Sequence, residues 1–527
     1  MVIGPMTRSE GFTSLEDHFD VLIIGGGATG LGIAVDAVTR GFRTALVEAG
    51  DFAQATSSRA TKLVHGGVRY LASGQIHLVY EALHERAVMM RNAPHLVHTQ
   101  PFLLPAYTRF ALPYYGAGLM FYDLMSGKAS MGATRLLGRK AALERVPNLE
   151  SNGLHGGVLY YDGQFNDARL ALALARTAAD RGATVLNYAR CIRVLQGGGK
   201  LVGAVVADVE TGKEHPVHAS VIFNAAGIFV DSVRSLDEPE SKPLLSVSRG
   251  SHIVVGPDAL AGGTGIMVPK TKDGRVIFAI PWQGRVVIGT TDVAASKPLM
   301  EPGHDGDEIG FLLETIHPYL ARPIETSDIL SVFSGLRPLV SGGVVATSKL
   351  SREHHIEASA HGLITVAGGK WTTYRRMAED AIDFACKHGM LEKRPCISST
   401  ISLRGAAAAA TDGTPYLREY GTDATAINES ILEDASLGKL IDPALPYTFA
   451  EVRYAVHVEM ARTVEDVLSR RTRALLLDSA AAARAAQAVA SLMAAELGRD
   501  EAWVNEQVSS FRALQSQRYS LAAELET

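Results

Sequence analysis

The sequence predicts an α/β protein followed by a C-terminal all-α region. An apolar run, residues 20–24, leads into a glycine-rich turn and a helical pattern, and a second apolar run follows at 43–48. That order is typical of a parallel sheet. Short β-like runs recur between residues 244 and 290, as in antiparallel sheets. After about Cys396 the chain is rich in Ala, Arg and Glu and poor in glycine, which indicates helices.

The composition is that of an ordinary globular protein. The chain has 527 residues, enough for two or three domains, of which 20% are charged and 47% hydrophobic. A net charge of −5 gives no general electrostatic reason to bind nucleic acid. Three scattered cysteines form neither a disulfide framework nor a metal-ligand pair, which suits a reducing cytoplasm. We expect no metal site, no signal peptide in the first 18 residues and no membrane-spanning run.

The turn after the first apolar run carries Gly25, Gly27 and Gly30 at G-x-G-x-x-G spacing. The first glycine allows a tight turn, the second lets a pyrophosphate approach the backbone, and the third lets the helix pack closely on the strand. Free amides at the helix start face the phosphates. Glu48 ends the second run about 20 residues on, where a carboxylate accepts ribose hydroxyls. The sequence therefore predicts a Rossmann-type unit that binds an adenine dinucleotide.

Periodicity and turn residues predict the remaining elements in order. We expect a loop at 51–67, a helix at 75–91, a short basic helix and turn at 136–149, a helix at 166–182, a strand at 184–186, a hairpin of 202–209 with 214–220, a buried strand at 221–227 that returns to the parallel sheet, a strand, glycine turn and helix at 363–373, and a linker at 406–415.

Beyond the first β-α-β unit the chain carries a series of further motifs. They are GDFAQATSS (50–58), KLVHGGVRYL (62–71), SRGSHIVV (248–255), IGTTD (288–292), FSGLRP (333–338), GGKWTTYR (368–375), VRYAV (452–456) and ARTVEDVLSRR (461–471). In this order, over nearly the whole chain, they closely resemble the FAD-dependent glycerol-3-phosphate dehydrogenases, which are D-amino-acid-oxidase-like flavoproteins. The chain departs from that pattern at 224–229, where NAAGIF replaces a segment of the NATGPW type, and 296–330 is less recognisable.

The resemblance implies a Rossmann-type FAD-binding domain with an antiparallel-sheet substrate domain and a C-terminal all-α cap domain. The expected FAD-binding domain is discontinuous and comprises 18–95, 155–240 and 333–392. The substrate-binding domain comprises 96–154 and 241–332, and the C-terminal helical domain comprises 393–527.

The reaction that the resemblance implies is oxidation of sn-glycerol 3-phosphate to dihydroxyacetone phosphate, with hydride transfer from C2 to flavin N5. Such a site holds a phosphate dianion, takes the proton of the C2 hydroxyl and stabilises charge on the reduced flavin. Planar guanidinium groups suit a phosphate. We expect Arg69, Arg337 and Arg352 to bind it, with Tyr70 and Lys370 as supporting donors.

For the proton, His252 is the expected base, because histidine titrates near neutral pH. Arg337 would help to polarise the C2 oxygen, and the alternative for His252 is a packed or capping residue at a strand start. The turn at 368–370 opens a helix whose amides would stabilise the reduced flavin. The role of Asp292 is open. The expected cofactor contacts are Gly25, Gly26, Gly27, Thr29, Gly30, Glu48, Thr56, Ser57, Ser58, Lys62, Leu63, His65, Gly66, Gly67, Ala226, Gly227, Gly335, Gly369, Lys370, Trp371 and Thr372.

The aromatic stretch 107–121, which includes Arg109 and is followed by Lys128, suggests contact with a lipid surface. Plain interdomain packing explains it equally well. With a lipid contact, a membrane quinone would accept the electrons, and the protein would be cytoplasmic and peripheral on the inner face of the cell membrane.

The C-terminal helices are expected to cap the active site or to form a homodimer interface. Their basic residues Arg470, Arg471 and Arg473 are expected to make ion pairs within the chain. Three alternatives for the activity stay open. They are a glycerol-3-phosphate oxidase that produces hydrogen peroxide, an amine or amino-acid oxidase of the same fold, and a non-catalytic redox sensor that binds a dinucleotide.

Overall fold

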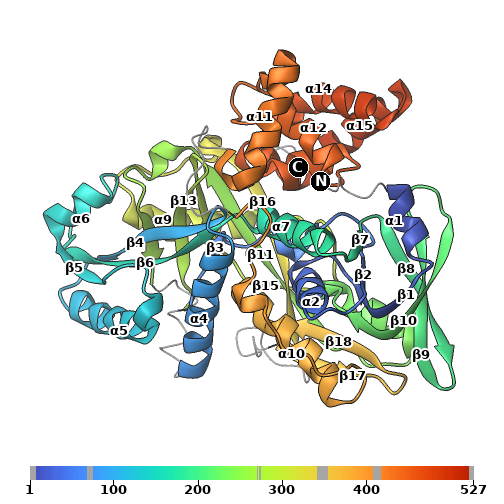
Figure 1. Cartoon of the computed structure of the whole chain (residues 1–527). Coiled ribbons are helices and arrows are strands. Elements are labelled where there is room, and N and C mark those ends of the chain that lie inside the picture. The colour runs from blue at the N-terminus through green and yellow to red at the C-terminus, as the bar shows by residue number, and fades with distance from the viewer. Residues whose placement is uncertain are drawn as a thin grey trace.

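The computed structural model describes residues 8–67, 75–269, 271, 274–340, 354–406 and 417–521. Two β-sheets lie side by side, helices pack on each of them, and the C-terminal helices cover both (Figure 1). The predicted α/β class with an α-helical C-terminal region is confirmed.

The first sheet has eight strands and is mostly parallel. Its strands are β1 (His18–Ile24), β2 (Thr44–Val47), β7 (Thr184–Leu186), β8 (Ala189–Gly197), β9 (Lys200–Asp208), β10 (Glu214–Asn224), β17 (His354–Ala358) and β18 (Leu363–Gly368). The order β18-β10-β1-β2-β7 is parallel throughout, β17 joins its edge antiparallel, and the β8–β9 hairpin extends from β10. This is the arrangement predicted for a Rossmann-type unit.

Both faces of this sheet are covered. On one face α2 (Ala28–Thr39), α7 (Asp167–Asp180) and α10 (Tyr374–Lys387) pack against Val21 and Ile23 of β1. On the other face α1 (Arg8–Ser14), the β8–β9 hairpin and α8 (Val230–Asp237) pack against Leu22 and Ile24. Since successive strand residues point to opposite faces, this double cover explains why the first apolar run is continuous.

The second sheet has ten strands. They are β3 (Leu63–Val64), β4 (Val97–Ala106), β5 (Arg135–Gly138), β6 (Gly156–Phe165), β11 (Leu245–Val255), β12 (Gly265–Val268), β13 (Ile277–Trp282), β14 (Arg285–Gly289), β15 (Val293–Ala295) and β16 (Ile329–Val340). The pairings are antiparallel, except that β12 lies parallel to β4. Its helices are α4 (Ile76–Asn92), α5 (Ala111–Ser126), α6 (Arg139–Arg145) and α9 (Gly306–Ile316).

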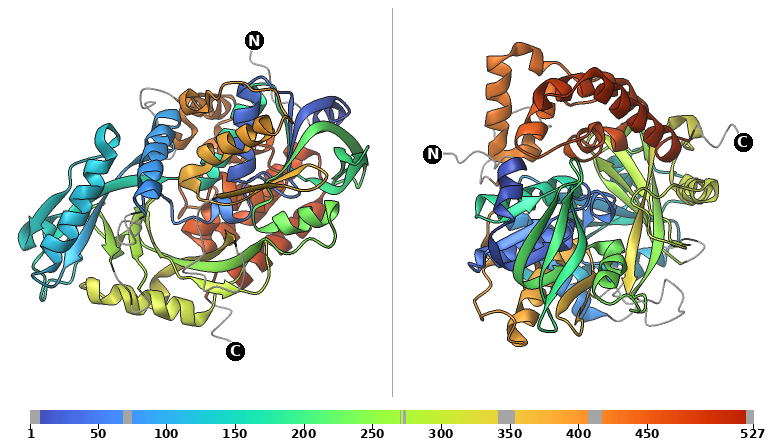
Figure 2. Two further views of the ribbon diagram at one scale, coloured as in Figure 1. Left: turned by 90° about the horizontal axis from the view of Figure 1, so that it is seen from below. Right: turned by 90° about the vertical axis from the view of Figure 1, so that its right-hand side faces the viewer.

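The C-terminal helices form one layer that lies across the two sheets (Figures 1 and 2). They are α11 (Ala424–Glu433), α12 (Phe449–His457), a π-helical turn (Asp466–Arg471), α13 (Ala474–Leu477), α14 (Ser479–Leu497) and α15 (Glu501–Arg518). Their apolar core includes Val254 and Phe333 of the second sheet, so the layer is packed on that sheet. In the part of the chain that the structure describes, no helix is long and apolar enough to cross a membrane.

Several predicted elements differ from those observed. The strands predicted at 214–220 and 221–227 are one continuous strand, β10. Its first half alternates between exposed and buried residues and its second half is buried on both faces, so one strand shows two patterns. Residues 136–138 belong to β5, and the helix predicted at 136–149 begins only at Arg139. The predicted linker lies, after Ala406, outside the described residues.

Two strands lie in a different sheet from the one that the expected domain boundaries imply. The ranges 155–240 and 333–392 were expected in the FAD-binding domain. However, β6 pairs with β4, and β16 pairs with β11 along its length, so both belong to the second sheet. Neither strand carries a local signal of the sheet that it joins, because its pairing partners lie far away in sequence.

Candidate functional site

The turn between β1 and α2 leaves no room for side chains. Gly25 has φ +118°, and a Cβ built there would lie 2.5 Å from the Ala225 carbonyl oxygen. A Cβ on Gly30 would lie 1.9 Å from the Gly25 carbonyl oxygen. Both clashes are with backbone atoms, so these positions require glycine. The turn therefore presents bare backbone and the first amides of α2, which is the surface that a pyrophosphate needs.

Glu48 binds this turn from the end of β2. Its Oε2 accepts from the Gly26 amide at 2.6 Å, and its Oε1 accepts from the Gly50 amide at 2.8 Å. Burial raises the pKa of Glu48, and the two amides act against that rise. The carboxylate thus lies beside the glycine turn, as the sequence predicts for a ribose ligand.

The loop of residues 51–62 lies against the start of α2. Ser57 Oγ accepts from the Ala28 amide at 3.0 Å, and the indole Nε1 of Trp371 donates to the Ser57 carbonyl at 2.8 Å. Thr56 Oγ1 donates to the Leu336 carbonyl of β16 at 2.6 Å. This loop therefore joins the glycine turn, the turn before α10 and the second sheet.

The turn at 368–372 and the 225–227 segment complete this surface. Gly368 and Gly369 both have φ +76°, and Thr372 Oγ1 donates to the His65 carbonyl at 3.5 Å. Gly66 donates its amide to the Tyr122 hydroxyl. In the 225–227 segment, the backbone of Ala225 and Ala226 is what a side chain on Gly25 would clash with. Gly227 in the same segment has φ +58°. The expected cofactor segments are thus brought to one region from distant parts of the chain.

The Lys62 side chain is engaged elsewhere. Its Nζ binds Asp167 at 2.7 Å and the Ser58 carbonyl at 2.9 Å, and the side chain is fully buried. Burial lowers the pKa of Lys62 to about 7, with Asp167 opposing that shift. Because these partners bury the amine, the Lys62 side chain is not placed to contact the cofactor as expected. Leu63, likewise, lies buried in β3.

The expected catalytic residues share one face of the second sheet. Along the β11–β16 pair, Ser248 faces Arg337, Gly250 faces Gly335 and His252 faces Phe333. Directly paired residues project to the same face, and so do residues two positions apart. This face lies against the 51–62 loop, because His252 Nε2 is 3.0 Å from Thr61 Oγ1.

Arg337 is held across Gly250. Its guanidinium donates to Thr290 Oγ1 and to the Thr291 carbonyl, both at 3.0 Å, and lies 3.4 Å from an oxygen of Asp292. Its side chain keeps 25% of its surface exposed. Asp292, whose role the sequence left open, is thus a weak counter-ion that orients Arg337.

His252 is buried and neutral. Its ring stacks on Phe333 with centroids 4.5 Å apart, and only 2% of its surface is exposed. Burial lowers the pKa of His252 well below its usual value, and the charges of Lys62 and Arg337 add to that shift. The lowered pKa leaves the imidazole unprotonated near neutral pH and so able to accept a proton, but it also makes the imidazole a weaker base than an ordinary histidine.

Some predicted site residues lie outside the described residues, and some residues observed at the site were not predicted. Arg69, Tyr70 and Arg352 lie outside the described residues. Sequence reasoning missed Thr61, which binds the imidazole, and Asp167, which binds Lys62. Asp167 follows the Asn166 N-cap of α7, so in sequence it is an ordinary acidic residue of a first helical turn.

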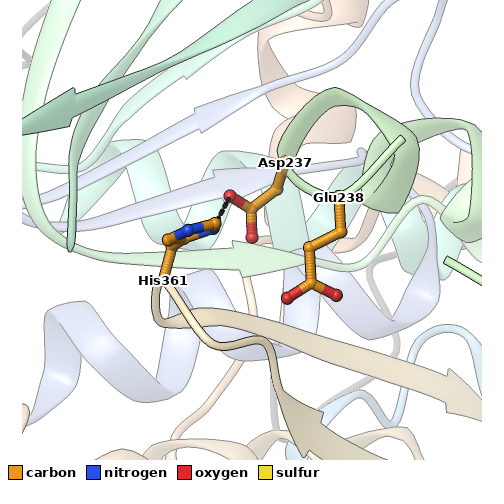
Figure 3. Close-up of side chains that lie close together, drawn as sticks. All are labelled: Asp237, Glu238 and His361. Atoms are coloured by element: carbon orange, nitrogen blue, oxygen red, sulfur yellow. Dashed lines mark hydrogen bonds and ion pairs between the residues drawn. The ribbon is translucent and has the colours of Figure 1, made fainter. Parts of the chain in front are cut away.

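A separate cluster joins Asp237, Glu238 and His361, whose side chains converge beside β18 (Figure 3). These side chains have the chemistry of metal ligands, yet protein donors already occupy the Asp237 carboxylate. His361 Nδ1 donates to it at 2.9 Å and Ser359 Oγ at 2.5 Å, and Glu238 accepts from the Ala360 amide. The cluster anchors the turn that leads into β18.

Comparisons with known proteins agree with this arrangement. The family described as FAD dependent oxidoreductase matches residues 20–375, and the C-terminal domain of alpha-glycerophosphate oxidase matches 365–504. The mitochondrial glycerol-3-phosphate dehydrogenase of Arabidopsis thaliana is 40% identical over 91% of this chain and 83% of its own length. The FAD complex of the Bacillus halodurans glycerol-3-phosphate dehydrogenase is 30% identical, with a TM-score of 0.79 over 98% of both chains. The FAD-bound L-alpha-glycerophosphate oxidase of Mycoplasma pneumoniae, 16% identical with a TM-score of 0.55 over 69% of this chain and 94% of its own, shares the fold.

Proposed function

Because the chain belongs to the FAD-dependent oxidoreductase family, within the group of the glycerol-3-phosphate dehydrogenases, we propose that it oxidises sn-glycerol 3-phosphate to dihydroxyacetone phosphate. The observation that carries the proposal is one face of the second sheet, on which the Arg337 guanidinium and the neutral His252 imidazole lie together.

FAD fits the residues present. The glycine turn offers bare backbone, Glu48 lies at its edge, and Ser57 reaches the first turn of α2. These groups would hold the adenosine and pyrophosphate, and the turn at 368–372 would meet the isoalloxazine. Bound FAD supplies the two-electron acceptor that hydride transfer requires.

The residues of the second sheet would act on the substrate. Oxidation removes a hydride from C2 and a proton from its hydroxyl. Arg337 would bind the phosphate dianion and polarise the C2 oxygen, since its side chain keeps 25% of its surface exposed on the face that His252 shares. His252 would take the proton. We retain the predictions of further phosphate ligands besides Arg337, namely Arg69, Tyr70, Arg352 and Lys370.

An anaerobic mixing experiment tests this function. Glycerol 3-phosphate should bleach the visible flavin band promptly, whereas glycerol should not, because binding energy from the phosphate drives the reaction. Arg337→Ala should raise the KM sharply, and His252→Ala should slow flavin reduction while FAD stays bound. A flavoprotein that glycerol 3-phosphate never reduces would contradict the proposal. Hydrogen peroxide formed under air at the turnover rate would instead identify an oxidase.

We further propose that a membrane quinone receives the electrons and that α5 lies on the lipid surface. The stretch 110–124 exposes apolar residues at helical spacing, namely Phe110, Tyr114, Phe121 and Leu124. Phe110 and Leu124 are 85% and 75% exposed. Exposed Arg109, Arg135, Arg139 and Lys140 lie nearby in sequence and suit anionic headgroups. This arrangement supports contact with a lipid surface, while the cytoplasmic location and a homodimer remain predictions.

Flotation with anionic vesicles tests the surface of α5. The double change Phe110→Asp with Leu124→Asp should abolish co-flotation and leave anaerobic flavin reduction unchanged. Leu432→Asp is the control, because Leu432 is 86% exposed but belongs to α11, which lies in the C-terminal layer at the top of Figure 1, far from α5 at the lower left. Equal flotation of both variants would argue against the lipid contact.

A further inference from the structure

We propose that the C-terminal domain is part of the FAD-binding apparatus. In this proposal Arg471 and Arg473 act as positioning residues that hold the 51–62 loop against the glycine turn. Neither residue needs to touch FAD. The proposal depends on FAD as the cofactor and not on the identity of the substrate.

Asp51, at the start of the loop, is bound by two arginines of the C-terminal domain. Its carboxylate is fully buried. It accepts from Arg470 Nε at 2.6 Å and from Arg471 NH2 at 2.9 Å, and Arg471 NH1 makes a second contact. Although burial alone would raise it, the two arginines lower the pKa of Asp51. The predicted ion pairs within the chain are confirmed, and they cross between the two domains.

Arg473 holds the other end of the same loop. Its NH2 donates to the Ser58 carbonyl at 2.6 Å and lies 3.2 Å from Asp167 Oδ1. Asp167 also accepts from the Ala60 amide at 2.9 Å and binds Lys62. Arg473 thus binds the loop at Ser58, three residues before Thr61, whose hydroxyl contacts His252.

The segment between these two attachments makes the contacts expected of a cofactor loop. The Ala53 amide donates to the Gly26 carbonyl at 3.0 Å, and Ser57 binds the first turn of α2. Asp51 lies three positions after Glu48, whose carboxylate binds Gly26 and Gly50. A shift of this loop would therefore move the groups that surround the dinucleotide.

Backbone strain is concentrated at the same junction. The described non-glycine residues with positive φ are Ala53, Lys62, Tyr188, Gln283, Met460 and Arg473. Ala53 and Lys62 lie in the loop, and Arg473 holds it. Tyr188 donates its hydroxyl to Asp466, and the Met460 carbonyl accepts from Asn187, which also binds Asp51. Such conformations persist only where surrounding contacts impose them.

An alternative role for these arginines is stability alone. In that case, loss of a contact would lower the melting temperature of the apoprotein and leave its FAD affinity unchanged. FAD affinity therefore separates the two roles. Arg462 provides a matched control, because it also joins the C-terminal domain to the first sheet, through Glu210 after β9, but does not touch the loop.

The experiment is FAD titration of deflavinated protein, followed by flavin fluorescence, with melting of the apoprotein in parallel. Arg471→Met and Arg473→Met should raise the Kd for FAD by about tenfold or more, the factor that one lost charge-assisted hydrogen bond contributes. Arg462→Gln should leave the Kd within about twofold, well below that factor. A wild-type Kd in both methionine variants would overturn the proposal, whatever their melting temperatures.

Milder changes answer the question if the methionine variants do not fold. Asp51→Asn keeps the size of the side chain but removes its charge, and Arg473→Lys keeps the charge but loses the planar guanidinium that donates to two groups at once. Holoprotein of either variant should release FAD about tenfold faster than the wild type, by the same argument. A wild-type release rate in both would overturn the proposal. Since neither readout uses glycerol 3-phosphate, failure of the proposed activity would not affect the result.

Discussion

The position of Arg337 depends on the absence of a side chain at Gly250. A Cβ built on Gly250 would lie 2.2 Å from Arg337 NH2, 2.7 Å from its Cζ and 2.6 Å from Thr290 Oγ1. Carbon contacts are favourable only at about 3.5–4.0 Å. In a Gly250→Ala variant the Arg337 guanidinium and the Thr290 side chain must therefore move by about 1 Å or more, which disrupts the hydrogen bond between them. No charge in the site changes.

The expected magnitude follows from the contacts that are lost. A hydrogen bond to a charged group contributes about 1.5–3 kcal/mol, which corresponds to about 10-fold to 150-fold in an equilibrium or rate. A displacement of about 1 Å at a site of catalysis costs about 100-fold in rate. We expect kcat/KM for glycerol 3-phosphate to fall by about 100-fold, while FAD binding persists, because Gly250 lies outside the glycine turn.

The assay is steady-state oxidation of glycerol 3-phosphate with an artificial electron acceptor, together with the flavin spectrum. Gly256→Ala is the matched control, since Gly256 immediately follows β11 and no atom lies within 4 Å of a Cβ built there. Gly256→Ala should behave as the wild type. If Gly250→Ala also retained the wild-type kcat/KM, the placement of Arg337 at the substrate would be wrong.

Further predictions concern the histidine and the dependence on pH. Gly289→Ala places a Cβ 2.2 Å from His252 Cδ2, so it should slow flavin reduction in stopped-flow experiments and spare FAD binding; an unchanged rate would contradict the role of His252. Because the pKa of His252 is well below its usual value, flavin reduction at saturating glycerol 3-phosphate should be flat between about pH 6 and 8; a step near pH 6.5 that persists at saturation, where titration of the substrate phosphate no longer limits binding, would refute this. Burial raises the pKa of Glu451 from 4.5 to about 7. Between these two pH values the native state therefore holds a proton that the unfolded state has lost. The free energy of unfolding should fall by about 3 kcal/mol as the pH rises from 4.5 to about 7. Glu451→Gln should remove that slope and raise the melting temperature at pH 8, which calorimetry would measure.

The glycine turn and the place of Glu48 beside it could be predicted from the sequence, because their signals are local. The spacing of Gly25, Gly27 and Gly30 reflects backbone clashes within a few residues, and Glu48 follows at the end of the next strand. Of the second sheet, only the strands between residues 244 and 290 were predicted, since each is a short apolar run bounded by turns; β4, β6 and β16 were not predicted, and β5 lies where a helix was expected. Nor could the register of the strands be predicted, which places His252 and Arg337 on one face.

Lys62 illustrates where local reasoning fails. It lies in a motif that resembles a cofactor loop, so a cofactor contact was the natural expectation. Its partner Asp167 is more than 100 positions away, and only the tertiary fold brings the two together. The buried carboxylate then determines where the lysine lies, because an unpaired charge in that position would be far more costly.

The same reasoning explains why the C-terminal domain was read as a cap. In sequence, Arg470, Arg471 and Arg473 are a basic run on helices, which most often lies at a surface. All three are buried, and Arg473 has φ +65°, a conformation that local propensity disfavours by about 1 kcal/mol or more. A residue that is both buried and strained is held there by its partners, here the Ser58 carbonyl and Asp167. Ser58 belongs to the 51–62 loop and Asp167, the first residue of α7, binds that loop through the Ala60 amide, so the arrangement serves the loop and not the helix. Strain at Arg473 should then be relieved by Arg473→Gly, which tolerates the backbone but lacks the guanidinium. That variant loses the buried guanidinium and its partners, so its apoprotein should melt below the wild type. Its FAD affinity is the deciding readout: it should bind FAD weakly, and tight FAD binding by it would show that the helices merely cover the site.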